Sequence, residues 1–459
     1  MSLSRPTGTP PDPTLRTLDI GHAAYAAVVD PDTAFWALVD KTRVADTLAG
    51  GPLRGAYRRH ADDCRRELHA LCFELQPSGV YLNPTERCNL NCRYCYLPEE
   101  QRRSGGHMSV DQLLISLSRL RDYFRSIMPQ GGKPRAIFHG AEPLMNRDAV
   151  FAAIDAFAGD FIFGLQTNGT LLDDRAVNFL ATRNVSIGLS LDGPSADVTD
   201  ATRQTWSRRS VHNRVLAAMD RLQGYGSWSV IATCTTENLP HLTAMVELFH
   251  ARKVPTCMLN AVRCTLAGAR DVRPADEAMS RAFFAALDRT HELYRDSGRK
   301  LVVANFANIL IAILAPTARR LMCDISPCGA GRAFFALSAD GSLYPCSEFI
   351  GLSRFNGGHL LADGGIEAAL TSDAFTAVTG RNVDAFDPCS ECAIRHFCGS
   401  PCPAEAHEMN GGMGGSGAFC AFYRDQVKYA LRVIADGKAD DYLWDGWDDG
   451  TETLFDLVH

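Results

Sequence analysis

The stretch ERCNLNCRYCYLPEE at residues 86–100 decides how this sequence is interpreted, because it places Cys88, Cys92 and Cys95 within eight positions. The spacing is C-x3-C-x2-C, and no fourth cysteine lies beside it. A structural zinc site normally has four protein ligands. Three adjacent thiolates therefore favour a [4Fe–4S] cluster with one iron that has no protein ligand. The spacing alone also permits a zinc site that takes its fourth ligand from elsewhere.

The composition is that of an ordinary globular protein with a large core. The chain has 459 residues, of which 46% are hydrophobic and 22% charged, so we expect two to four domains. A net charge of −7 gives no electrostatic case for a nucleic-acid or anionic-membrane partner. The N-terminus has no apolar signal segment, and the longest apolar run, at 308–316, is too short to cross a bilayer. We therefore expect a cytoplasmic protein.

From residue 78 onward, short apolar segments alternate with amphipathic ones. Strands are expected at 79–85, 135–140, 161–167, 185–192, 229–235 and 256–262. Helices are expected between them at 109–127, 147–158, 173–182, 211–224 and 239–251. This alternation predicts an α/β fold with a parallel sheet and right-handed crossovers. After residue 320 the sequence becomes rich in Gly and Cys, which indicates a segment held together by metal.

With Tyr94 before its last cysteine, the opening motif resembles the C-x3-C-x-aromatic-C signature of the radical SAM superfamily. The resemblance implies a partial (β/α)6 TIM-like barrel. It also implies that the open iron chelates the amino and carboxylate groups of S-adenosylmethionine (SAM), and that one electron cleaves SAM to a 5′-deoxyadenosyl radical. Cofactors of this kind carry the radical chemistry, while the protein positions and shields them.

Further matches follow successive predicted strands. HGAEPL resembles the family's G-G-E-P loop, with Ala141 in place of the second Gly and Glu142 as acceptor for the SAM ammonium group. LQTNGT and LSLDGP match positions of polar and ribose contacts, and Arg203 of DATR would pair with the SAM carboxylate. Each stretch alone is weak, but their order along the strands supports one site. The residues of this predicted SAM site are Tyr94, Gly140, Ala141, Glu142, Thr167, Asn168, Ser190, Asp192 and Arg203.

Eight more cysteines fall between residues 323 and 420. From Cys328 onward their spacing resembles the seven-cysteine SPASM extension of radical SAM enzymes, and Cys323 adds an eighth. The resemblance implies two further [4Fe–4S] clusters, which makes three in all; zinc ribbons are the alternative. The first further cluster would be held by Cys323, Cys328, Cys346 and Cys402. The second would be held by Cys389, Cys392, Cys398 and Cys420.

We therefore expect five segments along the chain. They are a disordered tail at 1–16, a small N-terminal α/β unit at 17–77, the radical SAM barrel at 78–300, the SPASM domain at 301–435 and a C-terminal tail at 436–459. The N-terminal unit has two expected strands around an Asp-Pro-Asp turn but no clear third strand. Such a unit would suit binding of a peptide by strand addition.

The resemblance implies a maturase that crosslinks or oxidises residues of a ribosomally made precursor peptide. Its other partner would be an external one-electron donor of the flavodoxin or ferredoxin type. One alternative is an anaerobic sulfatase-maturing enzyme, which oxidises Cys or Ser to formylglycine. Another is a non-catalytic iron–sulfur electron carrier, although a carrier has no use for a SAM site.

One departure weighs against the sulfatase-maturing alternative. Those enzymes carry an Asp directly after the cysteine of their G-x4-C motif, and that position is Ser347 here. A serine cannot accept a proton as a carboxylate does. The adjacent Glu348 would substitute for the Asp only if its side chain pointed differently, so the sulfatase-maturing alternative stays open, and we expect Glu348 to be a solvated turn residue. Of the cysteines outside the motifs, Cys234 and Cys257 are expected in the core, and Cys264 is a weak active-site candidate.

Overall fold

The computed structural model describes residues 14–49, 52–319, 321–400 and 402–448. Most of the predicted tail at 1–16 lies outside these ranges, but its last residue does not belong to a tail. Arg16 begins strand β1 (Arg16–Leu18), which pairs antiparallel with β2 (Tyr25–Val29). With β3 (Trp36–Asp40), these strands form a three-stranded sheet in the order β1-β2-β3. The two strands predicted around the Asp-Pro-Asp turn are confirmed, and β1 supplies the third.

Two helices complete the N-terminal unit: α1 (Val44–Ala49) and α2 (Pro52–His69), the second continuing as a π-helical turn to Glu74. The unit has a small core of its own, in which Phe35 and Tyr57 meet edge to face at 5.3 Å between ring centroids. The Trp36 indole also donates to the carbonyl of Ile313 at 2.8 Å, so the unit is fastened to the rest of the chain.

A nine-stranded sheet forms the centre of the molecule, in the order β10-β9-β8-β7-β6-β5-β4-β11-β12. Its six central strands are all parallel, and each lies within or one residue from a predicted segment. They are β4 (Gly79–Leu82), β5 (Arg135–Phe138), β6 (Ile162–Thr167), β7 (Ser186–Ser190), β8 (Trp228–Cys234) and β9 (Thr256–Ala261). The predicted α/β fold is confirmed.

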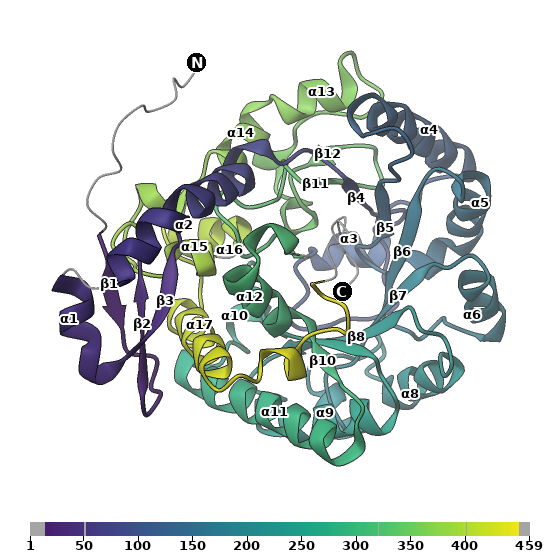
Figure 1. Cartoon of the computed structure of the whole chain (residues 1–459). Helices are drawn as coiled ribbons and strands as arrows, with labels where there is room; N and C mark the ends of the chain where they lie inside the picture. The colour runs from purple at the N-terminus through teal and green to yellow at the C-terminus, as the bar shows by residue number, and fades with distance from the viewer. Residues whose placement is uncertain (1–13, 50–51, 320, 401, 449–459) are drawn as a thin grey trace.

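Helices follow the strands along the outer rim of the curved sheet (Figure 1). The five predicted crossover helices are α4 (Val110–Ile127), α5 (Arg147–Phe157), α6 (Asp174–Ala181), α8 (His212–Arg221) and α9 (Leu242–Ala251). Helix α4 begins with a capping box, in which the side chains of Ser109 and Gln112 each accept from the other's backbone N–H. Its apolar stripe, including Leu113 and Leu117, is buried against the sheet with Phe138.

The C-terminal region does not form a separate body but extends the sheet. Strand β11 (Phe334–Leu337) pairs parallel with β4, and β12 (Leu343–Tyr344) pairs antiparallel with β11. On the opposite edge, β10 (Val302–Val303) pairs with β9. The partial barrel of six strands is therefore continued at both edges by segments that follow it in sequence.

The remaining α-helices lie in the connections and in the C-terminal region. They are α3 (Glu99–Ser104), α7 (Ala196–Asp200), α10 (Ala267–Arg270), α11 (Asp276–Ser297), α12 (Ala304–Leu314), α13 (Gly365–Leu370), α14 (Asp373–Thr379), α15 (Arg395–Cys398), α16 (Pro403–Asn410) and α17 (Cys420–Ala435). Figure 1 shows α12 and α17 between the N-terminal unit and the barrel strands.

Part of the predicted C-terminal tail is packed rather than free. Leu443 is fully buried, and its carbonyl accepts from Nζ of Lys300 at 3.2 Å. Residues 449–459 lie outside the described ranges. Within those ranges, no helix combines the length and the apolar character that crossing a membrane requires.

Candidate active site

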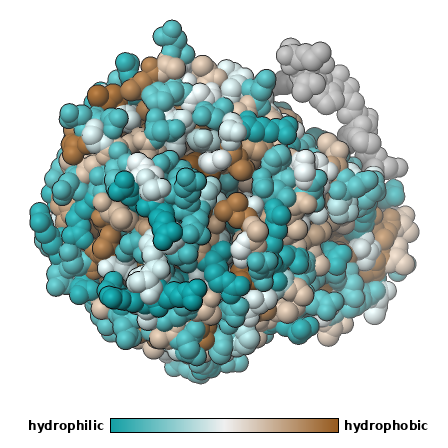
Figure 2. Space-filling model, turned by 180° about the vertical axis from the view of Figure 1, so that it is seen from behind, coloured by the Kyte–Doolittle hydropathy of each residue, from teal (hydrophilic) through white to brown (hydrophobic). Residues whose placement is uncertain are grey.

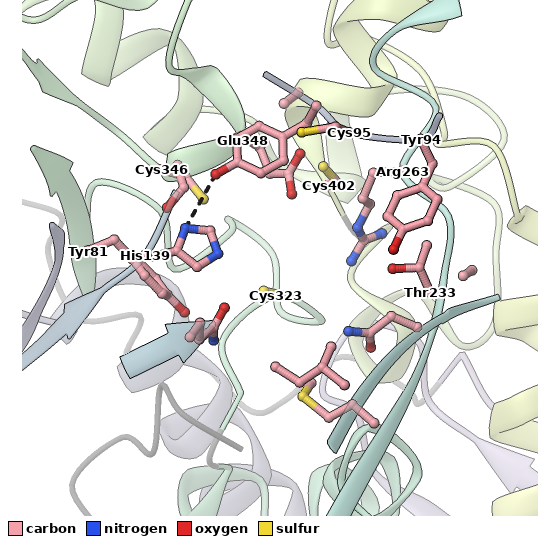
Figure 3. Close-up of a pocket in the computed structure, with 18 of the residues that line it drawn as sticks. Tyr81, Tyr94, Cys95, His139, Thr233, Arg263, Cys323, Cys346, Glu348 and Cys402 are labelled. Atoms are coloured by element: carbon pink, nitrogen blue, oxygen red, sulfur yellow. Dashed lines mark hydrogen bonds between the residues drawn. The ribbon is translucent and has the colours of Figure 1, made fainter. Parts of the chain in front are cut away.

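One cavity of about 400 Å³ lies where the parallel strands end at their carboxyl side. Active sites of parallel α/β folds form at this edge, because the loops after the strands converge there. The cavity is lined from one side by the barrel and from the other by the Cys-rich C-terminal region (Figure 3). The predicted triad and SAM-site residues that line it are Cys88, Cys92, Tyr94, Cys95, Gly140, Ala141, Thr167, Asn168, Ser190 and Arg203.

The loop that carries the three cysteines is held from within by Arg102, which the sequence analysis did not single out. The Arg102 side chain is buried, and its guanidinium donates to the Leu97 carbonyl at 3.0 Å and to Oδ1 of Asn91 at 3.0 Å. Burial raises the pKa of Cys92 to about 11 and also raises that of Cys95, while the charge of Arg102 opposes both shifts. A bound metal would deprotonate such thiols.

Cys88 has two polar neighbours that fix its place. The Asn168 side chain lies 3.8 Å from Sγ of Cys88 and donates to Oδ1 of Asn89 at 2.9 Å. On the outer side, the indole N–H of Trp206 donates to the Cys88 carbonyl at 2.8 Å. The chain thus holds this cysteine through both its backbone and its sulfur, and nothing in the motif pointed to Trp206.

The loop after β5 needs glycine at one position and not at the next. Gly140 has φ of 94°, and a Cβ there would lie 2.4 Å from the Asn83 side chain. Ala141 lies outside the left-handed region and lines the cavity, so the departure from Gly at this position is tolerated.

The structure does not place the Glu142 carboxylate among the residues that line the cavity. The side chain is fully buried; Oε1 accepts from Oγ1 of Thr167 at 2.8 Å, and Oε2 accepts from N of Asn168 at 2.8 Å. Burial nevertheless raises the pKa of this carboxyl group, and the hydrogen bonds oppose the shift. Glu142 therefore connects the loops after β5 and β6, and it positions Thr167 and Asn168 at the cavity wall.

Asp192 is likewise behind the wall, where it holds Arg203. Nε of Arg203 donates to Oδ2 of Asp192 at 2.9 Å, and both side chains are buried. The Tyr94 hydroxyl contacts both partners, and its ring lies 5.7 Å from the Arg203 guanidinium carbon. Since Nη1 of Arg203 has no protein hydrogen bond among the described residues, part of the fork remains available to an anion in the cavity.

Four cysteines of the C-terminal region line the same cavity: Cys323, Cys328, Cys346 and Cys402. They are the four that the sequence analysis assigned to one cluster. Cys402 has φ of 63°, a strained backbone for a residue other than Gly. All sixteen cysteines of the chain are free of disulfides. Seven of these thiols, three from the triad and four from the C-terminal region, line one cavity. Within the described ranges, no three His, Cys, Asp or Glu side chains converge closely enough to hold a single metal ion.

The other four predicted ligands form a second group away from this cavity. Burial raises the pKa of Cys398 first, and the neighbouring charges of Cys392, Cys420 and Cys389 raise it further. Between the two groups lies Arg381, whose buried guanidinium donates to the Ser400 carbonyl and hydroxyl at 3.0 Å each. Two sets of four thiols fit two iron–sulfur clusters by number and kind of donor.

Glu348 is not the solvated turn residue that the sequence predicted. It lies in the short helix Ser347–Phe349, directly after Cys346, and its carboxylate lines the cavity (Figure 3). Oε2 is buried and has no hydrogen-bond partner in the part of the chain that the structure describes; burial raises the pKa of the group to about 7, a shift that Arg263 opposes. The Ser347 hydroxyl is also buried and has no partner there. No pattern in the sequence indicates the turn geometry that directs the Glu348 side chain into the cavity.

Arg263 from the barrel and Tyr423 from the C-terminal region form a polar part of the cavity wall. Arg263 follows β9, Tyr423 lies in α17, and Nη1 of the arginine donates to the tyrosine hydroxyl at 3.1 Å. The next residue, Cys264, does not line the cavity, so the structure gives no support to it as an active-site candidate. Its backbone N–H donates to Oε1 of the buried Glu405 at 2.9 Å. Cys234 and Cys257 are fully buried core residues, as predicted.

Three rings that pack on one another line one part of the cavity: Tyr81, Tyr96 and His139. The Tyr96 hydroxyl lies 3.3 Å from Nδ1 of His139, the contact drawn as a dashed line in Figure 3. Burial lowers the pKa of His139 to about 4, so the imidazole is neutral at ordinary pH. The cavity therefore has an uncharged aromatic side as well as a polar one.

Comparison with known proteins agrees with this geometry. Residues 82–249 match the family model described as the radical SAM superfamily. An uncharacterized protein of Archaeoglobus fulgidus is 39% identical over 407 residues, which span 89% of this chain and 92% of that protein. A serine-type anaerobic sulfatase-maturating enzyme of Klebsiella aerogenes is 24% identical over 343 residues, which span 72% of this chain and 80% of the enzyme.

Two solved structures share the fold. The structure of anSMEcpe with bound AdoMet has a TM-score of 0.68 at 18% identity and covers 81% of this chain and 97% of its own. The structure of Streptococcus suis SuiB bound to the precursor peptide SuiA has a TM-score of 0.57 at 12% identity and covers 88% of this chain and 99% of its own. At these identities the likeness concerns the fold.

Proposed function

Because this chain belongs to the radical SAM superfamily, we propose that it is an enzyme that cleaves SAM and modifies side chains of a peptide substrate. One observation carries the proposal. The triad, seven of the nine predicted SAM-site residues and four C-terminal cysteines line a single cavity, together with polar groups that none of these roles uses. The third alternative from the sequence, a non-catalytic electron carrier, is wrong because this family consists of enzymes.

On the barrel side, Cys88, Cys92 and Cys95 would hold a [4Fe–4S] cluster with one open iron. When bound, the cluster and SAM supply a radical that abstracts hydrogen from the substrate. The chain's own residues orient SAM: Arg203 pairs with its carboxylate, while Thr167, Asn168 and Ser190 offer polar contacts along the wall. Glu142 and Asp192 act one layer behind, as positioning residues for these side chains.

On the C-terminal side, the wall would bind the substrate. Glu348 offers a carboxylate oxygen without a protein partner, and Arg263 with Tyr423 offers donors beside it. The peptide backbone and side chains carry complementary donors and acceptors. Cys323, Cys328, Cys346 and Cys402 would hold a second cluster, and Cys389, Cys392, Cys398 and Cys420 a third. This assignment treats residues 301–435 as a SPASM domain.

The N-terminal unit supports a peptide as the substrate class. The described part of its sheet ends at β1 on one edge and at β3 on the other, and an extended peptide can add a strand to such an edge. We place a precursor peptide there, with its modified segment reaching the cavity. SuiB, which shares the fold, was solved with a precursor peptide.

Sulfatase maturation remains the second candidate, and Glu348 is the observation that favours it. Ser347 stands where those enzymes carry an Asp, but the cavity still contains a carboxylate from the next residue. A relative with that activity is 24% identical over most of its length. Substrate identity, and not the presence of a carboxylate, separates the two candidates.

The test begins with anaerobic reconstitution and counts of iron and sulfide per chain. With dithionite and SAM, we expect release of 5′-deoxyadenosine by the native chain and none by the variant with Cys88, Cys92 and Cys95 replaced by Ala. The matched control replaces Cys64, Cys72 and Cys264, none of which lines the cavity, and should retain the activity. Release by the triad variant would contradict the proposal.

A second experiment separates the substrate classes. The chain is co-expressed with candidate precursor peptides encoded next to it and, separately, with a sulfatase. Mass spectrometry then reports a loss of hydrogen or a new crosslink in the peptide, or formylglycine in the sulfatase. Modification of the sulfatase alone would overturn the peptide-maturase proposal in favour of the second candidate.

A further inference from the structure

The surface directly outside the triad loop carries exposed arginines around one tryptophan. We call the set Arg87, Arg103, Trp206, Arg208 and Arg209 the arginine patch; its four arginines are exposed. Helix α3 contains Arg103 and lies on the far side of the molecule in Figure 1. Figure 2 shows that side from the front, and hydrophilic residues predominate on it.

Trp206 joins this patch to the triad loop. The guanidinium carbon of Arg103 lies 5.2 Å from the centre of the indole ring, and that of the buried Arg102 lies 5.4 Å from it. The same indole donates to the carbonyl of Cys88. A single hydrogen bond therefore connects Trp206 of the patch to the backbone of a triad cysteine.

Backbone hydrogen bonds fix the two loops against each other. Leu90 and Thr205 form an antiparallel bridge, and N of Asn91 donates to the Gln204 carbonyl at 2.8 Å. N of Arg209 donates to Oγ1 of Thr205 at 2.9 Å, which closes the turn that presents the arginines. Hydrogen bonds therefore hold the loop that carries Arg208 and Arg209 against the triad loop.

The charge of the patch is largely uncompensated. Among the described residues, Arg87, Arg208 and Arg209 form no ion pair. Arg103 lies 4.0 Å from Glu99, an exposed contact of little energetic weight. The whole chain, by contrast, has a net charge of −7. A local excess of four arginines would attract an acidic protein to this part of the surface.

We propose that the arginine patch is the docking surface for an acidic one-electron carrier protein that serves the triad-bound cluster. The proposal rests on the proposed function, because it requires a cluster at the triad. One electron leaves the reduced flavin or iron–sulfur centre of the carrier and enters that cluster, so the carrier is oxidised as the cluster is reduced. Trp206 and its hydrogen bond to the Cys88 carbonyl connect the patch to the loop that would hold this cluster.

The test uses the reconstituted full chain and a recombinant flavodoxin as the probe. The patch variant is R208E/R209E, and the matched control is R58E/R59E, an equally exposed pair of adjacent arginines in α2. Anaerobic biolayer interferometry at low ionic strength should show flavodoxin binding weakened about tenfold or more in the patch variant and nearly unchanged in the control. Binding by the native chain should weaken as salt screens the charges.

A second readout separates this proposal from the function it rests on. Dithionite needs no docking surface, so with SAM present dithionite should drive 5′-deoxyadenosine release equally in all three proteins, while reduced flavodoxin should drive it more slowly in the patch variant alone. Equal flavodoxin binding and equal flavodoxin-driven release in the patch and control variants would overturn the docking proposal. No release by the native chain with dithionite would instead count against a triad cluster. The variant R103Q, scored in the same way, covers the case in which R208E/R209E does not fold.

Discussion

Arg203 and Asp192 form a buried ion pair, in which Nε of the arginine donates to Oδ2 of the aspartate at 2.9 Å. The aspartate has a second anchor, since its Oδ1 accepts from N of Thr233 at 2.9 Å. The pair therefore fixes the guanidinium relative to β8 and leaves one nitrogen for the cavity. A charge held this way is well placed to bind a carboxylate, but it is costly if its partner is lost.

The substitution Asp192→Asn should destabilise the apo-protein and weaken SAM binding. Asparagine preserves the shape but leaves the Arg203 charge buried without compensation, which typically costs about 3–5 kcal/mol. Chemical unfolding and calorimetric SAM titration measure the two effects. The control is Asp155→Asn, which breaks an exposed pair with Arg183 and should change stability by less than about 0.5 kcal/mol. Equal stability of the two variants would contradict the inference.

Replacing Glu348 by Gln should separate SAM cleavage from substrate modification. The side chain lines the cavity but touches none of the predicted SAM contacts through a hydrogen bond, so 5′-deoxyadenosine release should persist. Modification of the peptide should fall by about 10²-fold or more if the carboxylate accepts a substrate proton. Product is quantified by mass spectrometry under single-turnover conditions. Ser347→Ala is the matched control and should retain modification; loss in that variant instead would assign the role to the hydroxyl.

The barrel could be predicted because its signals are local. The capping box at Ser109, the apolar stripe of α4 and the short apolar strands are each signalled by residues within a few positions of one another. The pairing of β11 with β4 could not be predicted in the same way. Phe334 of β11 lies opposite Gly79, more than 250 residues earlier, and a four-residue strand in a Gly-rich segment carries no periodic pattern.

The same difference between local and non-local signals applies to the candidate site. Motifs after successive strands identified the triad and seven SAM-site residues of the cavity lining, because parallel strands bring their carboxyl ends together. The direction of individual carboxylates was not predictable: Glu142 and Asp192 turn away from the cavity because nearby donors satisfy them, and Glu348 turns inward. Arg102 and Trp206 belong to no motif, and their roles became visible only through their contacts.

Glu405 should be essential for joining the barrel to the C-terminal region. Its carboxylate is fully buried and accepts from N of Cys264 at 2.9 Å and from N of Ala418 at 3.0 Å. Glu405→Ala leaves two buried donors unsatisfied, at a cost of about 2–6 kcal/mol in the free energy of unfolding. Urea unfolding of the apo-protein measures it. Glu277→Ala, on the exposed face of α11, should be nearly neutral, and a neutral Glu405→Ala would disprove the connection.

Arg381 connects the two groups of C-terminal cysteines, and its loss should release their iron. Its two bonds to Ser400 hold the loop that leads to the strained Cys402, and it also donates to the carbonyls of Met413 and Gly415, after α16, at 2.9 Å each. Burial lowers the pKa of Arg381, and the thiols of both groups oppose the shift. This places one cation beside two sets of anionic ligands.

The substitution Arg381→Met removes both the charge and the four hydrogen bonds. We expect iron to fall from about twelve to about four per chain, as two clusters are lost and the triad cluster stays. Dithionite-driven 5′-deoxyadenosine release should persist, because the triad loop is held by Arg102 instead. Arg354→Met, an exposed arginine in the same region, is the control and should keep its iron. Full iron content in Arg381→Met would show that the two cysteine groups do not depend on this arginine.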